Sequence, residues 1–285
     1  GISIQVVPFA AEFKEKLTEL QSEASLDGQS IDLKTAFHQR FLFPMLKQLK
    51  EHHLFDKIAT GHRALLQEDQ VAKRIRIFQS ENPNMDEAEL LLGLSQADLG
   101  SLILPLGSIP DFMLQKLAKE LAVTADPDEW LALQELRTFS TLGFEAVSVS
   151  GISLGLVKEE GLVPGMFYDS LNTPGVRYRA TDVSFAHHRI IVTEESELQI
   201  QEIIFEDCSW FGRGDLKLKR LECSMRTLNH LKPISIKLLE FEGNRLKGYL
   251  NQPLRGEEAN IFKGETVLWI EGTEILGGGR VFRTN

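Results

Sequence analysis

A serine flanked by glycines is the sharpest catalytic signal in this chain of 285 residues. Residues 151–155 read Gly-Ile-Ser-Leu-Gly and match G-x-S-x-G, the nucleophile elbow that lifts a serine hydroxyl onto a sharp strand-to-helix turn. Such a serine becomes a nucleophile when a histidine takes its proton and an acid orients that histidine. Ser153, Asp182 and His230 follow one another in the order Ser, Asp, His, and we expect this triad if the chain is a hydrolase.

The sequence around this motif favours a plainer interpretation. A hydrolase with such an elbow places several strand-helix units before the serine, whereas the residues that precede Ser153 show mainly helical periodicity. A helix should also begin at the elbow, but Gly161 and Pro164 would end it after about two turns. Asp169 or Asp207 could also serve as the acid. We therefore keep a serine esterase as the alternative and expect a glycine-rich strand and turn.

Two pairs of adjacent histidines raise the question of a metal site. Neither His52-His53 nor His187-His188 can chelate a metal alone, because neighbouring residues point in different directions on helices and on strands. His62 could join the first pair only through the tertiary structure. We expect surface or hydrogen-bonding histidines, with neither a metal nor a cofactor.

A run of three glycines lies near the end of the sequence, at residues 277–279. It does not match a phosphate-binding loop, because neither a G-K-[ST] sequence nor a helical pattern follows it. We expect a flexible turn before Val281.

Cysteine usage and hydropathy bear on the compartment. Cys208 and Cys223 form neither a Cys-x-x-Cys metal pattern nor a disulfide-dense framework, although one bond between them stays open. No stretch reaches the roughly eighteen apolar residues that a membrane-spanning helix needs. We expect a soluble protein of a reducing compartment, the cytoplasm, with a secreted effector as the alternative.

The charge of the chain argues against nucleic acid as a partner. The formal net charge is −10 and the isoelectric point about 5.3, whereas a nucleic-acid-binding surface must neutralise phosphates. The longest basic run, Lys73–Arg76, is expected on the solvated face of a helix. A faint helix-turn-helix pattern lies within residues 86–122, but this segment carries six acids and two lysines. We therefore do not expect nucleic acid to bind.

The candidate groups belong to two halves of different character. In the N-terminal half, apolar residues recur at steps of three and four, which places them on one face of a helix. Pro44 should kink the longest helix, and Asp126-Pro127 should start the last one. The expected helices span residues 13–24, 33–54, 85–92, 96–104, 112–121 and 127–139.

A glycine-rich passage separates the two halves. After Phe139 the helical periodicity is lost, and residues 146–150 alternate in polarity as a half-buried strand does. We expect an all-helical domain over residues 1–142 and a β-rich domain over residues 143–285.

The β-rich half contains a repeat of eighteen residues. Segments that begin at Leu198, Leu216 and Ile234 match at five apolar columns, one of which aligns Phe205 with Cys223. Alternation inside each segment has the period of two of a strand, and a slip in phase indicates a bend or bulge. Stacked coils of this kind would form a short β-solenoid.

Antiparallel strands of similar length would produce the same spacing. Residues 242–245 make a plausible hairpin turn, which fits an antiparallel sandwich or barrel. The three repeats at residues 198–251 therefore leave both architectures open.

These features predict an α+β protein of two domains whose β-rich surface binds another protein. Repeats without phosphate loops or buried charge pairs are typical of surfaces that present a long face to a partner. We expect a non-catalytic adaptor, assembly component or secreted effector, with the serine hydrolase built on Ser153 as the alternative. No pattern in the sequence indicates the oligomeric state.

Overall fold

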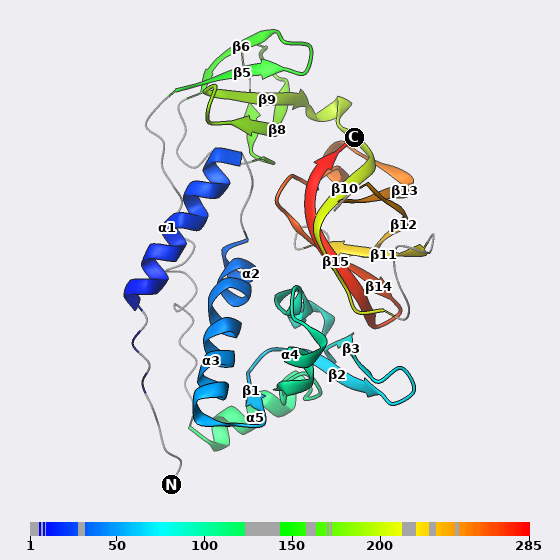
Figure 1. Cartoon of the computed structure of the whole chain (residues 1–285). Coiled ribbons are helices and arrows are strands. Elements are labelled where there is room, and N and C mark those ends of the chain that lie inside the picture. Colours follow the sequence, from blue (N-terminus) through cyan, green and yellow to red (C-terminus); the bar gives the residue numbers. More distant parts are fainter. Residues whose placement is uncertain are drawn as a thin grey trace.

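The computed structural model describes residues 6, 8, 10–27, 32–122, 143–157, 164–169, 171, 173–212, 221–227, 232–242 and 245–285. They form three parts (Figure 1): an N-terminal part of helices and short strands, a small sheet at the top of the view, and a larger closed sheet. The larger sheet contacts both of the other parts, so it is the centre of the fold.

The N-terminal part opens with a long helix and an interrupted one. The elements are α1 (Ala10–Asp27), α2 (Leu33–Phe37), a π-helical turn (His38–Leu42) and α3 (Phe43–His53). Asp32 starts α2, because its carboxylate accepts hydrogen bonds from the backbone N–H groups of Lys34 and Thr35. The interruption expected at Pro44 occurs as the π-helical turn just before it.

Four short strands lie among these helices, so the prediction of an all-helical N-terminal domain is wrong. β1 (Ile58–Ala59) and β4 (Leu102–Ile103) pair in parallel, and β2 (Ala64–Asp69) and β3 (Arg74–Gln79) form an antiparallel hairpin. The basic run expected on a helix thus contributes Arg74 and Arg76 to β3. These segments contain good helix formers such as Leu, Arg and Gln, and strand pairing overrides that preference.

The remaining helices of this part are short. Two 3-10 helices (Pro83–Met85 and Ala88–Leu91) precede α4 (Gln96–Ser101) and α5 (Asp111–Glu120). Ser95 and Asp98 form a capping box at α4, in which each side chain accepts a hydrogen bond from the other residue's backbone N–H. The helix expected after Asp126 lies outside the described residues.

The small sheet has five described strands, in the order β6-β5-β9-β8-β7. β5 and β9 run parallel and the other neighbours antiparallel. One face is buried through alternate residues such as Phe144 and Ile190. The strands are β5 (Phe144–Ser148), β6 (Ser153–Val157), β7 (Phe167–Asp169), β8 (Arg177–Ser184) and β9 (Arg189–Glu194).

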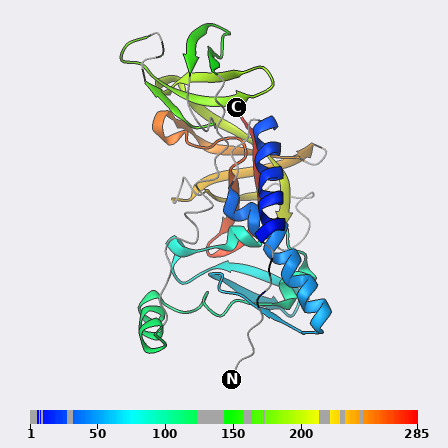
Figure 2. The ribbon, with the colours of Figure 1, turned by 90° about the vertical axis from the view of Figure 1, so that its left-hand side faces the viewer.

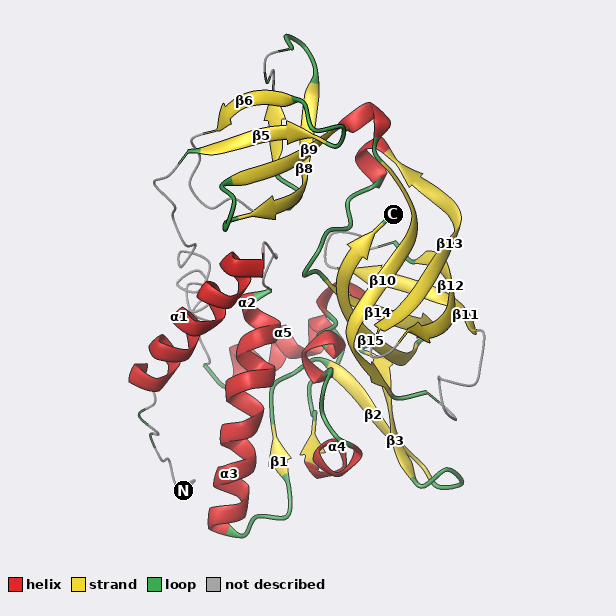
Figure 3. Cartoon of the chain, turned by 45° about the horizontal axis from the view of Figure 1, so that its top comes forward, coloured by secondary structure: helices red, strands yellow, loops and turns green. Residues whose placement is uncertain are grey.

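The larger sheet closes on itself as an antiparallel barrel (Figure 3). β10 pairs with β13 on one side and with β15 on the other, which completes the ring β10-β13-β12-β11-β14-β15. Fully buried Trp269 packs edge-on against Phe205 inside, with ring centroids 5.5 Å apart. The strands are β10 (Gln199–Trp210), β11 (Leu221–Thr227), β12 (Ile234–Glu242), β13 (Arg245–Arg255), β14 (Thr266–Glu271) and β15 (Glu274–Thr284).

The pairing of these strands shows that the β-solenoid prediction is wrong. Cys223 of β11 lies opposite Ile236 of β12, and β11 has β12 and β14 as its neighbours. The column that aligned Cys223 with Phe205 therefore does not stack, because Phe205 lies opposite Leu246 on β13. These strands pair antiparallel with their neighbours, which was the alternative that the sequence left open.

A hairpin of the N-terminal part extends the barrel sheet. Ile77 of β3 lies opposite Ile275 of β15, so β3 and β2 continue the sheet beyond the ring. Figure 2 shows this part below the barrel and the small sheet above it, with α1 running alongside. The described residues resume at residue 143, so part of the expected boundary at residues 140–146 lies outside them, and the division at residue 142 remains a prediction.

The three glycines expected in a flexible turn lie inside β15, so that prediction is also wrong. A Cβ atom on Gly278 would lie 2.3 Å from the carbonyl oxygen of Val267 and 2.9 Å from Leu92 Cδ1. A Cβ atom on Gly277 would lie 2.2 Å from the carbonyl oxygen of Ser209. The glycines therefore let β15 pass close to β14 and β10 and close the barrel.

We predict that Gly278→Ala destabilises the protein by at least about 2 kcal/mol, because the backbone of β14 must move to admit the methyl group. The matched control is Gly100→Ala in α4, where the nearest atom to an added Cβ lies 4.0 Å away. That change should be neutral or mildly stabilising. Urea unfolding measures the loss of unfolding free energy in each variant. Equal losses would show that the packing of β15 does not require a glycine at position 278.

Candidate functional site

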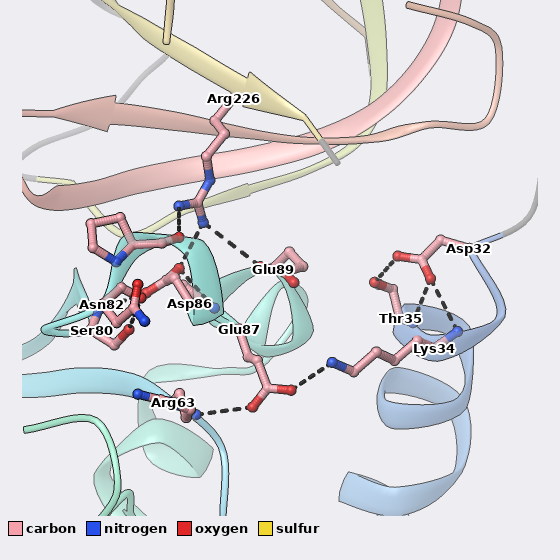
Figure 4. A network of polar contacts seen from close by, with 12 residues as sticks. Asp32, Lys34, Thr35, Arg63, Ser80, Asn82, Asp86, Glu87, Glu89 and Arg226 are labelled. Carbon is pink, nitrogen blue, oxygen red and sulfur yellow. Dashed lines mark hydrogen bonds and ion pairs between the residues drawn. The ribbon is translucent and has the colours of Figure 1, made fainter. Parts of the chain in front are cut away.

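The N-terminal part and the barrel are joined by residues 86–93, which we call the connecting segment (Figure 4). At its start the buried carboxylate of Asp86 accepts a hydrogen bond from the backbone N–H of Ser80 at 2.6 Å. From β11 of the barrel, Arg226 donates Nη2–H to Asp86 Oδ1 at 2.7 Å and Nη1–H to the carbonyl of Pro83 at 3.3 Å. A buried ion pair thus ties the segment to the barrel wall.

The next residue connects the segment to the other side. Glu87 pairs with Lys34 of α2 at 2.5 Å and accepts a hydrogen bond from the backbone N–H of Arg63 at 3.1 Å. Burial alone would raise the pKa of Glu87, but these partners hold it below its usual value. Two successive carboxylates therefore fix the segment between α2 and the barrel.

A third carboxylate of the segment is poorly compensated. Glu89 is 8% exposed, and its Oε2 lies 3.9 Å from Arg226 Nη2, which is too far for a hydrogen bond. Burial raises the pKa of Glu89 to about 7, and Asp86 adds to the rise while Arg226 and Lys34 oppose it. A carboxyl group that titrates near neutral pH beside a cavity is a candidate functional group.

Two buried histidines pack against each other, His38 at the start of the π-helical turn and His62 just before β2. The rings of His38 and His62 lie 4.8 Å apart, and Phe43 stacks on His62 at 5.3 Å. Burial, reinforced by His38, lowers the pKa of His62 to about 4, so this ring is neutral at physiological pH. Among the described residues no group of three or more histidines, cysteines or acids is placed to hold a metal ion.

The larger of two cavities beside the connecting segment has a volume of about 220 Å³. It lies between α2 with its π-helical turn and the strands β10 and β15 of the barrel. Polar groups from both sides converge on it, together with backbone at three glycines. Its lining is Leu20, Asp32, Thr35, Ala36, Gln39, Arg40, Leu92, Gly93, Asp207, Ser209, Gly264, Thr266, Gly279 and Arg280.

The charges of this cavity are mixed. Arg280 pairs with Asp207 at 2.8 Å and with Glu206 at 3.1 Å, and Arg40 lines the helical side. Hydroxyl and amide groups such as those of Ser209 and Gln39 can both donate and accept hydrogen bonds. The cavity therefore suits a small polar ligand that has donors and acceptors of its own.

The two thiols of the chain lie on the other side of the barrel wall. Asp207 and Ser209 line the cavity, whereas Cys208 between them packs against the barrel core. Cys223 belongs to the same core, and the two cysteines form no disulfide. Burial raises the pKa of each thiol to about 12, so both remain protonated and unreactive at neutral pH.

The proposed hydrolase triad is only partly described. Ser153 is exposed and begins β6, which follows β5 in an antiparallel hairpin, whereas a nucleophile elbow needs a strand-to-helix turn. Asp182 lies on β8, and its carboxylate accepts a hydrogen bond from the backbone N–H of Val183 at 3.0 Å. His230 lies outside the described residues.

The residues of the connecting segment escaped the sequence analysis. Asp86 and Glu89 belong to a stretch that was interpreted only as an acidic helix, and Arg226 lies 140 positions from Asp86. No local pattern links an arginine in a strand to an acid so far away. The one available signal was two acids among the apolar residues of a segment that must be buried.

Comparison with known proteins identifies relatives for nearly the whole chain. Residues 1–128 match the family model described as the tRNA methyl transferase HUP domain. The tRNA-specific 2-thiouridylase MnmA of Geobacter metallireducens is 23% identical over 98% of this chain and 78% of its own length. The enzymes of the same name from Carboxydothermus hydrogenoformans and Hyphomonas neptunium are 24% and 25% identical over 99% of this chain, and 80% and 75% of their own lengths.

These similarities correct several predictions made from the sequence. A HUP match at the N-terminus agrees with an α/β part there and contradicts an all-helical domain. Relatives that are tRNA-specific enzymes contradict a non-catalytic adaptor, a serine hydrolase and the exclusion of nucleic acid. None of the described helices combines the length and the apolar character that crossing a membrane requires.

We predict that Arg226→Met destabilises the protein by about 3 to 5 kcal/mol, because it leaves the carboxylate of Asp86 buried without its cation. The double variant Asp86→Asn/Arg226→Met should recover part of this loss. Exposed Arg283 of β15 supplies the control Arg283→Met, for which we expect less than about 0.5 kcal/mol. Urea unfolding measures the free energy of unfolding of each variant. Equal values for Arg226→Met and Arg283→Met would contradict the prediction.

We predict that the protein loses stability as the pH falls from 6.5 to about 4, because His62 resists protonation when folded and accepts a proton when unfolded. The loss assigned to His62 should be about 3 kcal/mol. In His62→Gln this contribution disappears, and the curve of unfolding free energy against pH becomes flatter. Exposed His52 gives the control His52→Gln, which should keep the slope of the unchanged protein.

Proposed function

We propose that this chain acts on tRNA, in the modification of a uridine, and that the larger cavity receives the nucleotide. The observation that carries the proposal is the extent of the similarity, which covers 98% of the chain in the Geobacter relative. The N-terminal part, the small sheet and the barrel are therefore all included in one alignment with a tRNA-specific enzyme.

The size of the cavity supports a single nucleoside as its ligand. Enzymes that act on a base in RNA take it out of the stack and into a pocket of the protein. The volume of about 220 Å³ is smaller than the pockets that hold drug-sized ligands, and it suits one pyrimidine ring with part of its ribose.

The lining offers partners for the edge of uracil. This base presents two carbonyl oxygens that accept hydrogen bonds and one ring N–H that donates. Arg40 and Gln39 carry donors for the oxygens, and the carboxylate of Asp32 can accept from the ring N–H. A lining with both donors and acceptors suits a uracil ring better than an apolar ligand.

The charges near the cavity, more than the net charge of the chain, would decide whether an acidic protein binds RNA. Net charge is a sum over the whole chain, whereas physiological salt screens the interaction between an exposed charge and a phosphate beyond about 8 Å. Arg40 and Arg280 both face the cavity where a flipped nucleotide would bring its phosphates. The site of action is then the cytoplasm, in agreement with two cysteines that form no disulfide.

The sulfur for a thiolation must come from a donor other than Cys208 and Cys223. Formation of 2-thiouridine breaks the C=O bond at position 2 of the base, forms a C=S bond and releases the oxygen at the level of water, which requires a nucleophile that carries sulfur at the sulfide level. A thiolate is the reactive form of cysteine, whereas buried Cys223 and partly buried Cys208 pack in and against the barrel core as neutral thiols. A separate sulfur donor therefore has to reach the cavity.

We predict that the purified chain binds tRNA and that Arg40→Gln weakens this binding about tenfold, because a cation at the cavity is lost. The control Lys50→Gln removes a positive charge from α3 outside the cavity lining and should change the affinity less than about twofold. Filter binding at fixed ionic strength measures the dissociation constants.

Nucleoside analysis of tRNA tests the reaction itself. Cells without the gene should lack a thiolated uridine that the unchanged chain restores and Arg40→Gln restores poorly. The proposal fails if the chain binds tRNA no better than single-stranded DNA of equal length and no modified uridine depends on the gene.

A further inference from the structure

Two carboxylates of the connecting segment compete for one guanidinium group. Arg226 Nη2 lies 2.7 Å from Asp86 Oδ1 and 3.9 Å from Glu89 Oε2. The shorter contact is a charge-assisted hydrogen bond, and the longer one is an ion-pair distance without a hydrogen bond. The cluster of three groups is neutral only while Glu89 carries a proton.

These groups share a small cavity of about 70 Å³ at the base of the connecting segment. Glu89, Asp86 and Arg226 line it together with Thr227 and Thr266. The cavity has room for water, which would let a proton reach or leave Glu89 without unfolding of the segment. The carboxyl group can thus exchange its proton with solvent in the folded state.

Among the described residues, three charged groups from three elements act on the carboxyl group of Glu89. Asp86 belongs to the same segment, Arg226 comes from β11 and Lys34 from α2. Asp86 favours the neutral acid, whereas both cations favour the carboxylate. Burial dominates, and it raises the pKa of Glu89 to about 7, so the group changes its charge within the physiological range.

The same segment forms part of the wall of the larger cavity. The 3-10 helix Ala88–Leu91 carries Glu89 and leads directly into Leu92 and Gly93, which line that cavity. The backbone N–H of Gly93 donates to Ser209 Oγ of β10 at 2.9 Å. Thr266 lines both cavities. Glu89 in the small cavity and Gly93 in the larger one are thus only four positions apart in the chain, so a displacement of the segment at Glu89 also moves the wall of the larger cavity.

We propose that Glu89 is a positioning residue whose protonation holds the connecting segment against the barrel and so sets the shape of the larger cavity. Protonated Glu89 leaves Arg226 to Asp86. Ionised Glu89 draws Arg226 away and repels Asp86, and the segment loosens. The identity of the ligand rests on the proposed function, whereas the coupling of the two cavities does not.

Hydrogen exchange tests the coupling without any RNA. Three backbone N–H groups report on the segment, those of Ser80 and Ala88, which donate to Asp86, and that of Gly93, which donates to Ser209. After correction for the intrinsic exchange rate, their protection should fall about tenfold between pH 6 and pH 8 in the unchanged protein. Glu89→Gln should keep the high protection at both values.

The control is Glu81→Gln, which makes the same substitution at an exposed position. It should behave like the unchanged protein. Protection that does not change with pH in the unchanged protein overturns the proposal, even if Glu89→Gln fails to fold. An equal change in the unchanged protein and in Glu89→Gln also overturns it, because the titrating group then lies elsewhere.

Affinity for tRNA at constant ionic strength provides the second measurement. The dissociation constant should rise about fivefold from pH 6 to pH 8 in the unchanged protein, beyond any change in Glu89→Gln. If no variant binds tRNA while the exchange result stands, the proposed function fails and the positioning role survives. If tRNA binds with the same pH dependence in both proteins, Glu89 does not set the shape of the cavity.

Discussion

The buried ion pair between Asp86 and Arg226 is the interaction on which the arrangement of this protein depends. A carboxylate without exposure to water persists only because a guanidinium and two backbone N–H groups, from Ser80 and Ala88, compensate its charge. The partner comes from the barrel, so the N-terminal part cannot keep this loop structure on its own. Both cavities are lined by residues of the connecting segment, so their shapes depend on this ion pair.

Closure of the barrel supplies the second constraint. β15 has to lie within reach of β14 and β10, and at Gly278 a side chain would collide with the backbone of β14. The same close approach brings Leu92 against the strand and lets the loop around Gly93 bond to Ser209. The close approach of β15 to β14 thus fixes the position of Leu92 and Gly93, which form one wall of the larger cavity.

The larger cavity has a polar lining, whereas the core of the barrel beside it is apolar. Polar and charged groups of α2, β10 and β15 converge on the larger cavity, while Cys208 and Cys223 are turned into an apolar barrel. An alternation of side chains along β10 separates the two environments within three residues. The larger cavity therefore has the lining that a polar ligand needs, and the proposed thiolation would need a sulfur donor other than these two thiols.

The sequence by itself determined local features: the helices around residues 13–24 and 112–121, the antiparallel pairing that brings Glu242 opposite Arg245 and the alternating strands of the barrel. These follow from periodicity and turn chemistry, which act over a few residues. Only the tertiary structure decided that Arg76 lies on a strand, that β11 has β12 and β14 as neighbours and that Arg226 meets Asp86. Such contacts join residues far apart in the chain, and the free energy that selects them comes from burial and pairing, which no short stretch of sequence displays.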